Sequence, residues 1–172
     1  MKSPLAPCSA ICLVLCLALP MVLPAQAARR VGEAEVRTGA NGVPCFTISQ
    51  REEERGGAPD FGSITVTAAG DLPPLWRMVM PATRTFPVAF AMCVPYGGRI
   101  PALPQTPAAP LKEGEPYTVV IDTRAGKNDT RPLRYQARFC LARQGAGFVA
   151  QQLGSGGQPP GRKAMACPPR RG

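Results

Sequence analysis

The chain has 172 residues, with 20 basic side chains, 11 acidic side chains and no histidine. The absence of histidine excludes Ser or Cys nucleophiles activated by an imidazole, and also zinc sites that contain one. The cysteines form no close C-x-x-C pair, which disfavours a four-cysteine zinc site as well. We therefore expect no catalytic residues, no metal and no bound cofactor.

Residues 1–27 have the pattern of a secretory signal peptide. Lys2 supplies the positive charge, residues 11–23 are apolar, and the Ala-Gln-Ala sequence that ends at Ala27 matches a signal peptidase site. The apolar run is shorter than the roughly 20 residues that span a bilayer. Cys16 lies inside this run rather than at a lipoprotein cleavage site. We predict cleavage near Ala27, no stable membrane anchor, and a periplasmic or secreted location.

Seven short runs separated by glycine and proline predict strands. They cover residues 43–49, 63–68, 75–80, 86–94, 117–123, 134–142 and 147–153. Helical periodicity is nearly absent after the signal peptide, and 21 prolines would interrupt any long helix. Residues 28–153 are therefore predicted to form one all-β domain, a small antiparallel β-sandwich of the immunoglobulin type.

Alternating side chains within these runs predict which faces are buried. The inward set of the fourth run is Phe86, Val88, Phe90 and Met92, and that of the sixth run is Tyr135, Ala137, Phe139 and Leu141. The other runs contribute Phe46 and Ile48, Ile64 and Val66, Trp76 and Met78, and Val119 and Ile121. The charged run at residues 51–55 is predicted to be a solvated hairpin tip.

Two segments are predicted to stay irregular. Residues 95–116 contain six prolines and should cross the surface in an extended form. Tyr96 and Arg99 lie in this loop, where no strand alternation turns Tyr96 inward, and we predict that both contact a partner. Residues 154–172 have little apolar surface to bury and should form a flexible tail, held only at Cys167.

Removal of the signal peptide leaves four cysteines, Cys45, Cys93, Cys140 and Cys167, an even number that favours two disulfides in an oxidising compartment. Alternation turns the first three away from the predicted core. If the strands at 86–94 and 134–142 are neighbours, Cys93 can bond to Cys140, which leaves Cys45 for Cys167. We favour this pairing, and the other two connectivities stay open because spacing does not decide them.

The charge of the mature chain bears on its partner. Loss of Lys2 leaves a net charge of +8, which favours an acidic protein or an anionic envelope polymer. Nucleic acid is disfavoured, because the arginines are scattered with few aromatic residues between them. Two other functions remain as alternatives. One is a carboxylate-dependent hydrolase of envelope polymers, for which Asp122 is the one acid in an apolar context, and the other is a structural subunit of an envelope complex.

Several short motifs point to a family. They are residues 43–48 (VPCFTI), 75–76 (LW), 93–97 (CVPYG), 114–121 (GEPYTVVI) and 135–140 (YQARFC). Their arrangement resembles the type VI secretion immunity periplasmic proteins, which are usually lipoproteins. The resemblance implies a β-sandwich that neutralises an incoming toxin by occlusion and has no catalytic residues. The chain departs from this group in lacking the lipoprotein cysteine. We expect a secreted or periplasmic immunity-type binding protein.

Overall fold

The computed structural model of the chain describes residues 30–68, 73–126, 130–154 and 167. The strands within these ranges are β1 (Gly32–Thr38), β2 (Pro44–Ile48), β3 (Asp60–Ala68), β4 (Trp76–Val79), β5 (Val94–Pro95), β6 (Tyr117–Arg124), β7 (Arg134–Gln144) and β8 (Gly147–Leu153). They are accompanied by one α-helix, α1 (Gln50–Gly56), and one 3-10 turn, η1 (Ala40–Gly42). The predicted all-β fold is confirmed.

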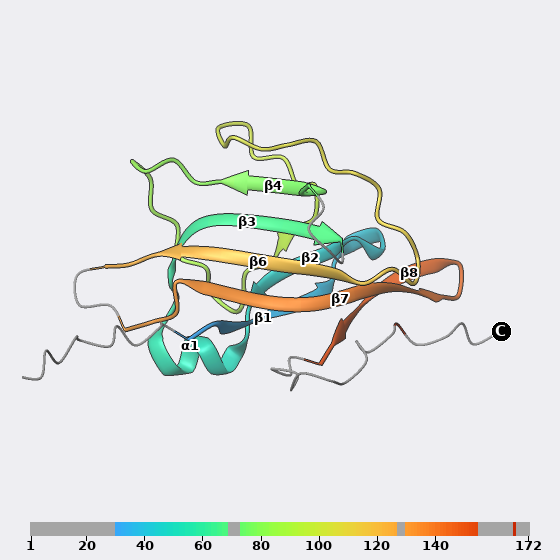
Figure 1. The fold of residues 1–172 in the computed structure, drawn as a ribbon, viewed down its shortest axis with the longest axis horizontal. Coiled ribbons are helices and arrows are strands. Elements are labelled where there is room, and N and C mark those ends of the chain that lie inside the picture. Colours follow the sequence, from blue (N-terminus) through green and yellow to red (C-terminus); the bar gives the residue numbers. More distant parts are fainter. Residues whose placement is uncertain (1–29, 69–72, 127–129, 155–166, 168–172) are drawn as a thin grey trace, which may run out of the picture.

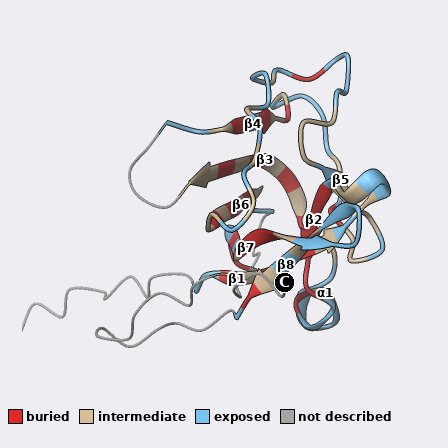
Figure 2. Cartoon of the chain, turned by 90° about the vertical axis from the view of Figure 1, so that its right-hand side faces the viewer, coloured by how far each residue is buried: buried red, intermediate tan, exposed pale blue. Residues whose placement is uncertain are grey.

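The strands form one curled sheet, in the order β4-β3-β6-β7-β1-β2-β5, with β8 also paired to β7. In Figure 1, β3, β6 and β7 run side by side, and Figure 2 shows how the path from β4 to β5 bends round an interior. The pairing differs from an antiparallel sandwich, because β1 lies parallel to β7 while it pairs antiparallel with β2. This shared strand joins what would otherwise be two separate layers.

The core lies inside the curl. All the predicted inward residues of the strands at 43–49, 63–68, 75–80, 117–123 and 134–142 are buried. Phe139 of β7 packs against Tyr117 of β6 and, across the interior, against Phe46 of β2, with ring centroids 5.5 and 5.4 Å apart. Apolar burial from opposite sides of the curl therefore holds the sheet in its bent form.

The prediction of a strand over residues 86–94 is wrong. Only Val94–Pro95 pairs with β2, and Pro87 makes an isolated bridge to Asp60. Proline lacks the N–H group that a continuous ladder needs, and Pro87 interrupts the segment. Val88 nevertheless turns inward and is buried, while Phe86 is partly buried against the core.

The N-terminal part of the domain also differs from expectation. Residues 51–55 belong to α1 rather than to a hairpin tip. Glu52 is buried in this helix and accepts two hydrogen bonds of 2.7 Å from Arg30 and one of 3.0 Å from Arg55. These bonds, chiefly that with Arg30, lower the pKa of Glu52. Strand β1 was not predicted, although Ala34 and Val36 alternate there with charged residues.

The cysteine pairing also differs from the favoured one. Cys45 is bonded to Cys93, with Cα atoms 5.3 Å apart, so neither Cys93–Cys140 nor Cys45–Cys167 forms. The reason is that the chain around Cys93 does not lie beside β7. It pairs with β2 instead, with Phe46 opposite Val94, which brings Cys93 next to Cys45.

The termini of the chain bear on two further predictions. The predicted signal peptide lies outside the described residues, and so does the predicted tail apart from Gly154 and Cys167. Within the described ranges, no helix combines the length and the apolar character needed to cross a membrane.

Candidate binding pocket at the seam of the sheet

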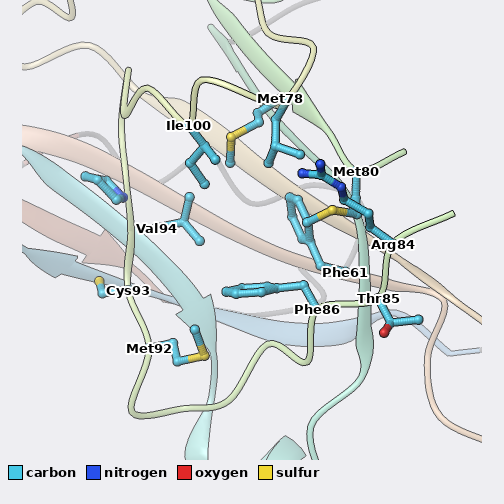
Figure 3. Close-up of a pocket in the computed structure, with 12 residues that line it drawn as sticks. Phe61, Met78, Met80, Arg84, Thr85, Phe86, Met92, Cys93, Val94 and Ile100 are labelled. Carbon is cyan, nitrogen blue, oxygen red and sulfur yellow. The ribbon is translucent and has the colours of Figure 1, made fainter. Parts of the chain in front are cut away.

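The two end strands of the sheet path, β4 and β5, approach each other across a gap that we call the seam. A pocket of about 330 Å³ lies in it (Figure 3). Its walls come from β3, β4 and the turn that follows β4 on one side, and from β5 and the Pro-rich loop on the other. The lining residues are Phe61, Met78, Met80, Arg84, Thr85, Phe86, Met92, Cys93, Val94, Pro95, Ile100 and Leu103.

The first wall is built on β3 and β4. Met78 lies opposite Ile64 in the β3–β4 ladder and, like it, points inward. The register between β3 and β6 shifts between Phe61 and Ser63, and a Cβ atom at Gly62 would lie 2.9 Å from the carbonyl oxygen of Asp122. A side chain does not fit at this position, so the bulge that sets Phe61 at the pocket depends on glycine.

Aromatic packing completes this wall. The rings of Phe61 and Phe86 meet edge to face, with centroids 6.5 Å apart. The backbone N–H of Phe61 donates to the carbonyl of Phe86 over 2.8 Å, and the N–H of Phe86 donates to the carboxylate of Asp60. Phe86 thus reaches the pocket from an irregular segment that is fixed to the start of β3.

The opposite wall is attached to β2. The Cys45–Cys93 disulfide holds the chain just before β5, and the hydroxyl of Thr47 donates to the carbonyl of Ala89 over 2.8 Å. The N–H of Tyr96 donates to the carbonyl of Pro44, which extends the short β2–β5 pairing by one bond. These links fix the backbone beside the pocket although the segment has almost no ladder of its own.

The Pro-rich loop covers the outer edge of β4. The N–H of Val79 donates to the carbonyl of Pro104, and the N–H of Thr106 donates to the carbonyl of Arg77, each over 2.9 Å. Leu103 is buried by this attachment, whereas Ile100 is 43% exposed. The loop therefore satisfies an edge that would otherwise be open, and it places one large apolar side chain at the mouth of the pocket.

Arg84 is the charged residue of the lining. Its side chain makes no hydrogen bond or ion pair with any residue of the described ranges, whereas its carbonyl accepts a bond of 2.7 Å from Arg124. Arg124 also donates to the carbonyls of Met80 and Pro81 and thereby holds the turn after β4. In Figure 3 the guanidinium of Arg84 lies beside the apolar side chains of the pocket, available to an anionic group.

The two residues predicted to contact a partner have different positions. Tyr96 is half-buried: its hydroxyl donates to the carbonyl of Ala109 over 2.6 Å, and its ring packs against Trp76 with centroids 5.5 Å apart. Burial raises its pKa to about 12. Arg99 is exposed and directly precedes Ile100 at the pocket mouth. A contact of either residue with a partner stays a prediction.

Sequence reasoning placed binding in the Pro-rich loop and missed the wall that faces it. The missed residues include Met80, Arg84 and Met92. A signal was available, because three methionines lie between residues 78 and 92, and flexible methionine side chains are common on adaptable binding surfaces. Alternation assigned Met78 and Met92 only to the core, since it does not distinguish a filled interior from the wall of a pocket.

Among the described residues, no carboxylate side chain lines this pocket. Glu33, Glu35 and Glu54 line an open polar hollow beside α1. Glu35 is paired with Arg37 at 2.8 Å, and Glu54 accepts a bond from Gln50. Within the described ranges, no group of three or more cysteine or carboxylate side chains is placed to hold a metal ion.

The geometry of the seam suits binding. The pocket offers an apolar interior, a cation at its edge, and walls fixed by a disulfide and backbone hydrogen bonds. Comparison of the chain with protein-family models, with curated proteins and with solved structures found no match.

Proposed function

We propose that the mature chain is an exported binding protein of the immunity type, which holds an acidic protein partner at the seam and neutralises it by occlusion. The observation that carries the proposal is the apolar pocket with Arg84 at its edge. An apolar or aromatic anchor of a partner that enters such a pocket, surrounded by polar contacts, is the usual centre of a protein interface.

The size and the charge of the site favour this kind of partner. A volume of about 330 Å³ lies at the lower end of the range of about 300–1,000 Å³ that is typical of ligand sites, and it suits one or two inserted side chains. Arg84 and Arg99 are both exposed and make no ion pair within the described ranges. Together with the net charge of the mature chain, they favour a partner with acidic side chains around its apolar anchor.

Rigidity supports the same function. The wall at Cys93 is fixed by the disulfide and the Tyr96 hydroxyl bond, so little backbone ordering is needed when a partner binds. The disulfide fits a protein of an oxidising exported compartment. The motif resemblance supplies the class of partner, a toxin that arrives in that compartment.

The test uses the processed protein as bait in envelope extracts and then measures the captured partner, together with the product of the neighbouring gene, as purified pairs. Ile100→Glu and Arg84→Glu are the site variants, because both side chains are exposed and the fold does not depend on them. We expect each variant to raise the dissociation constant by about tenfold or more. The matched control is Phe148→Glu in β8, since Phe148 is 38% exposed and does not line the pocket.

Two results would overturn the proposal. One is a partner whose affinity is unchanged by both site variants, which would place binding elsewhere on the surface. The other is the absence of any protein that binds the processed chain. Raised salt should slow association with the original protein more than with Arg84→Glu, because the guanidinium contributes to electrostatic steering.

A further inference from the structure

Cys140 is buried on a side of β7 where burial is unexpected. Its neighbours Phe139 and Leu141 point into the core, so strand alternation turns the Cys140 side chain to the outer face. The side chains of Arg138 and Ala142, which share that face, are partly exposed. Cys140 is nevertheless 0% exposed, which means that another part of the chain covers it.

Cys167 lies against Cys140. It is half-buried, and its thiol is close enough to that of Cys140 to contribute to the raised pKa of the Cys140 thiol. The other two cysteines of the mature chain are already joined to each other, so these two thiols have no competing partner within the protein.

We propose that Cys140 and Cys167 are oxidised to a second disulfide in the exported protein, which ties residue 167 to the outer face of β7. The proposal does not depend on the function of the pocket.

The reaction is a thiol–disulfide exchange with a disulfide-carrying oxidase of the exported compartment. The thiolate of Cys167, the more exposed partner, attacks one oxidase sulfur and forms a mixed disulfide. Cys140 then loses its proton and attacks the sulfur of Cys167. The new S–S bond forms as the mixed disulfide breaks, and the oxidase leaves with two thiols, having accepted two electrons and the two protons.

The order of attack follows from burial. Burial, followed by the hydrogen bond to Cys167, raises the pKa of the Cys140 thiol to about 12. A thiol of this kind is mostly protonated and shielded from a bulky oxidase at neutral pH. Cys140 is therefore suited to the second, intramolecular step, in which the sulfur it attacks is already beside it.

Trypsin can decide the connectivity, because basic residues separate all four cysteines. The test uses the full chain, exported by its own leader, purified without reductant and blocked with N-ethylmaleimide. We expect residues 139–143 (FCLAR) to be joined to 164–170 (AMACPPR), and residues 38–51 to be joined to 85–99, and all four peptides to be freed by reductant. Cys140 and Cys167 recovered with the blocking group attached, or either one joined to Cys45 or Cys93, would overturn the proposal.

A variant gives a second measurement. In Cys167→Ala the Cys45–Cys93 link should persist, and Cys140 should be recovered with the blocking group attached when the variant is unfolded in its presence. The thermal midpoint should fall by several degrees relative to the original protein, and reductant should lower the midpoint of the variant less. Equal midpoints for the two proteins, before and after reduction, would contradict a stabilising cross-link.

Discussion

The strands β3, β6 and β7 and the segment over residues 81–104 are held in different ways. The strands pair with one another in long registers, and their inward side chains form one continuous core. The segment is attached at separate points: the disulfide at Cys93, the Thr47–Ala89 bond, the Val79–Pro104 bond and the Arg124 contacts. Five prolines lie in this segment and prevent a continuous ladder.

The two regions should tolerate substitutions unequally. In the strands, the free energy of folding comes from many buried side chains, so the loss of one affects the whole domain. In the segment, the backbone is fixed by a few bonds, and side chains between them, such as Ile100 and Arg84, are exposed. The seam is thus a place where surface side chains can change without loss of the fold.

Truncation of a core ring should have the largest effect. Phe139→Ala removes a fully buried ring that contacts Phe46 and Tyr117. We expect a loss of about 3–5 kcal/mol in the free energy of unfolding, from the lost burial and the cavity left behind. Urea unfolding measures it. Phe148→Ala at the exposed hairpin is the control, and a similar loss for both variants would mean that the core is not the main source of stability.

Removal of the disulfide should affect the segment more than the strands. For Cys45→Ala/Cys93→Ala we expect a loss of about 2–4 kcal/mol in the free energy of unfolding, with faster amide exchange confined to residues 86–96. The wild-type protein in reductant should show the same pattern in that segment. Uniformly faster exchange across β3, β6 and β7 would show that the two regions do not unfold separately.

The ion pair between Glu52 and Arg30 should make the free energy of unfolding depend on pH. Because Arg30 lowers its pKa below the ordinary 4.5, the charged form of Glu52 stabilises the fold above that pH, and this contribution is lost as pH falls through the folded-state value. Glu52→Gln should therefore lower the free energy of unfolding by about 1.5–3 kcal/mol at pH 7. This difference from the wild type should shrink in acid. Glu54→Gln, on the exposed side of α1, is the control. A constant difference from pH 7 to pH 3 would contradict this account.

The smallest expected loss of stability comes from removing the hydrogen bond between the Tyr96 hydroxyl and the Pro-rich loop. Tyr96→Phe keeps the ring against Trp76 and removes the hydroxyl bond to the carbonyl of Ala109. We expect a loss of about 0.5–1.5 kcal/mol, measured by urea unfolding. Exchange should become faster only at the amides near Ala109, such as that of Ala109 itself, which bonds to Leu75. An unchanged free energy and unchanged exchange would show that the hydroxyl bond is not needed to hold the loop.

Part of this fold could be predicted from local patterns. Six of the seven predicted strands are present, and the residues assigned inward on β2, β3, β4, β6 and β7 are buried. Strand β1 alternates as clearly, but its small Ala34 and frequent charges weaken the signal. Helix α1 was not predicted, because an acidic run is typical of a solvated turn. Glu52 is instead buried through its pairing with Arg30.

Which side of each strand is apolar follows from local sequence, because side chains alternate along any extended chain whatever its neighbours are. Three features depend instead on long-range packing: β1 joins β7 to β2, Cys93 meets Cys45, and Phe61 and Ile100 face one pocket. These features depend on how far the sheet curls before its ends meet. That curvature is set by the packing of residues distant in sequence, such as Phe46 against Phe139, which no local pattern contains.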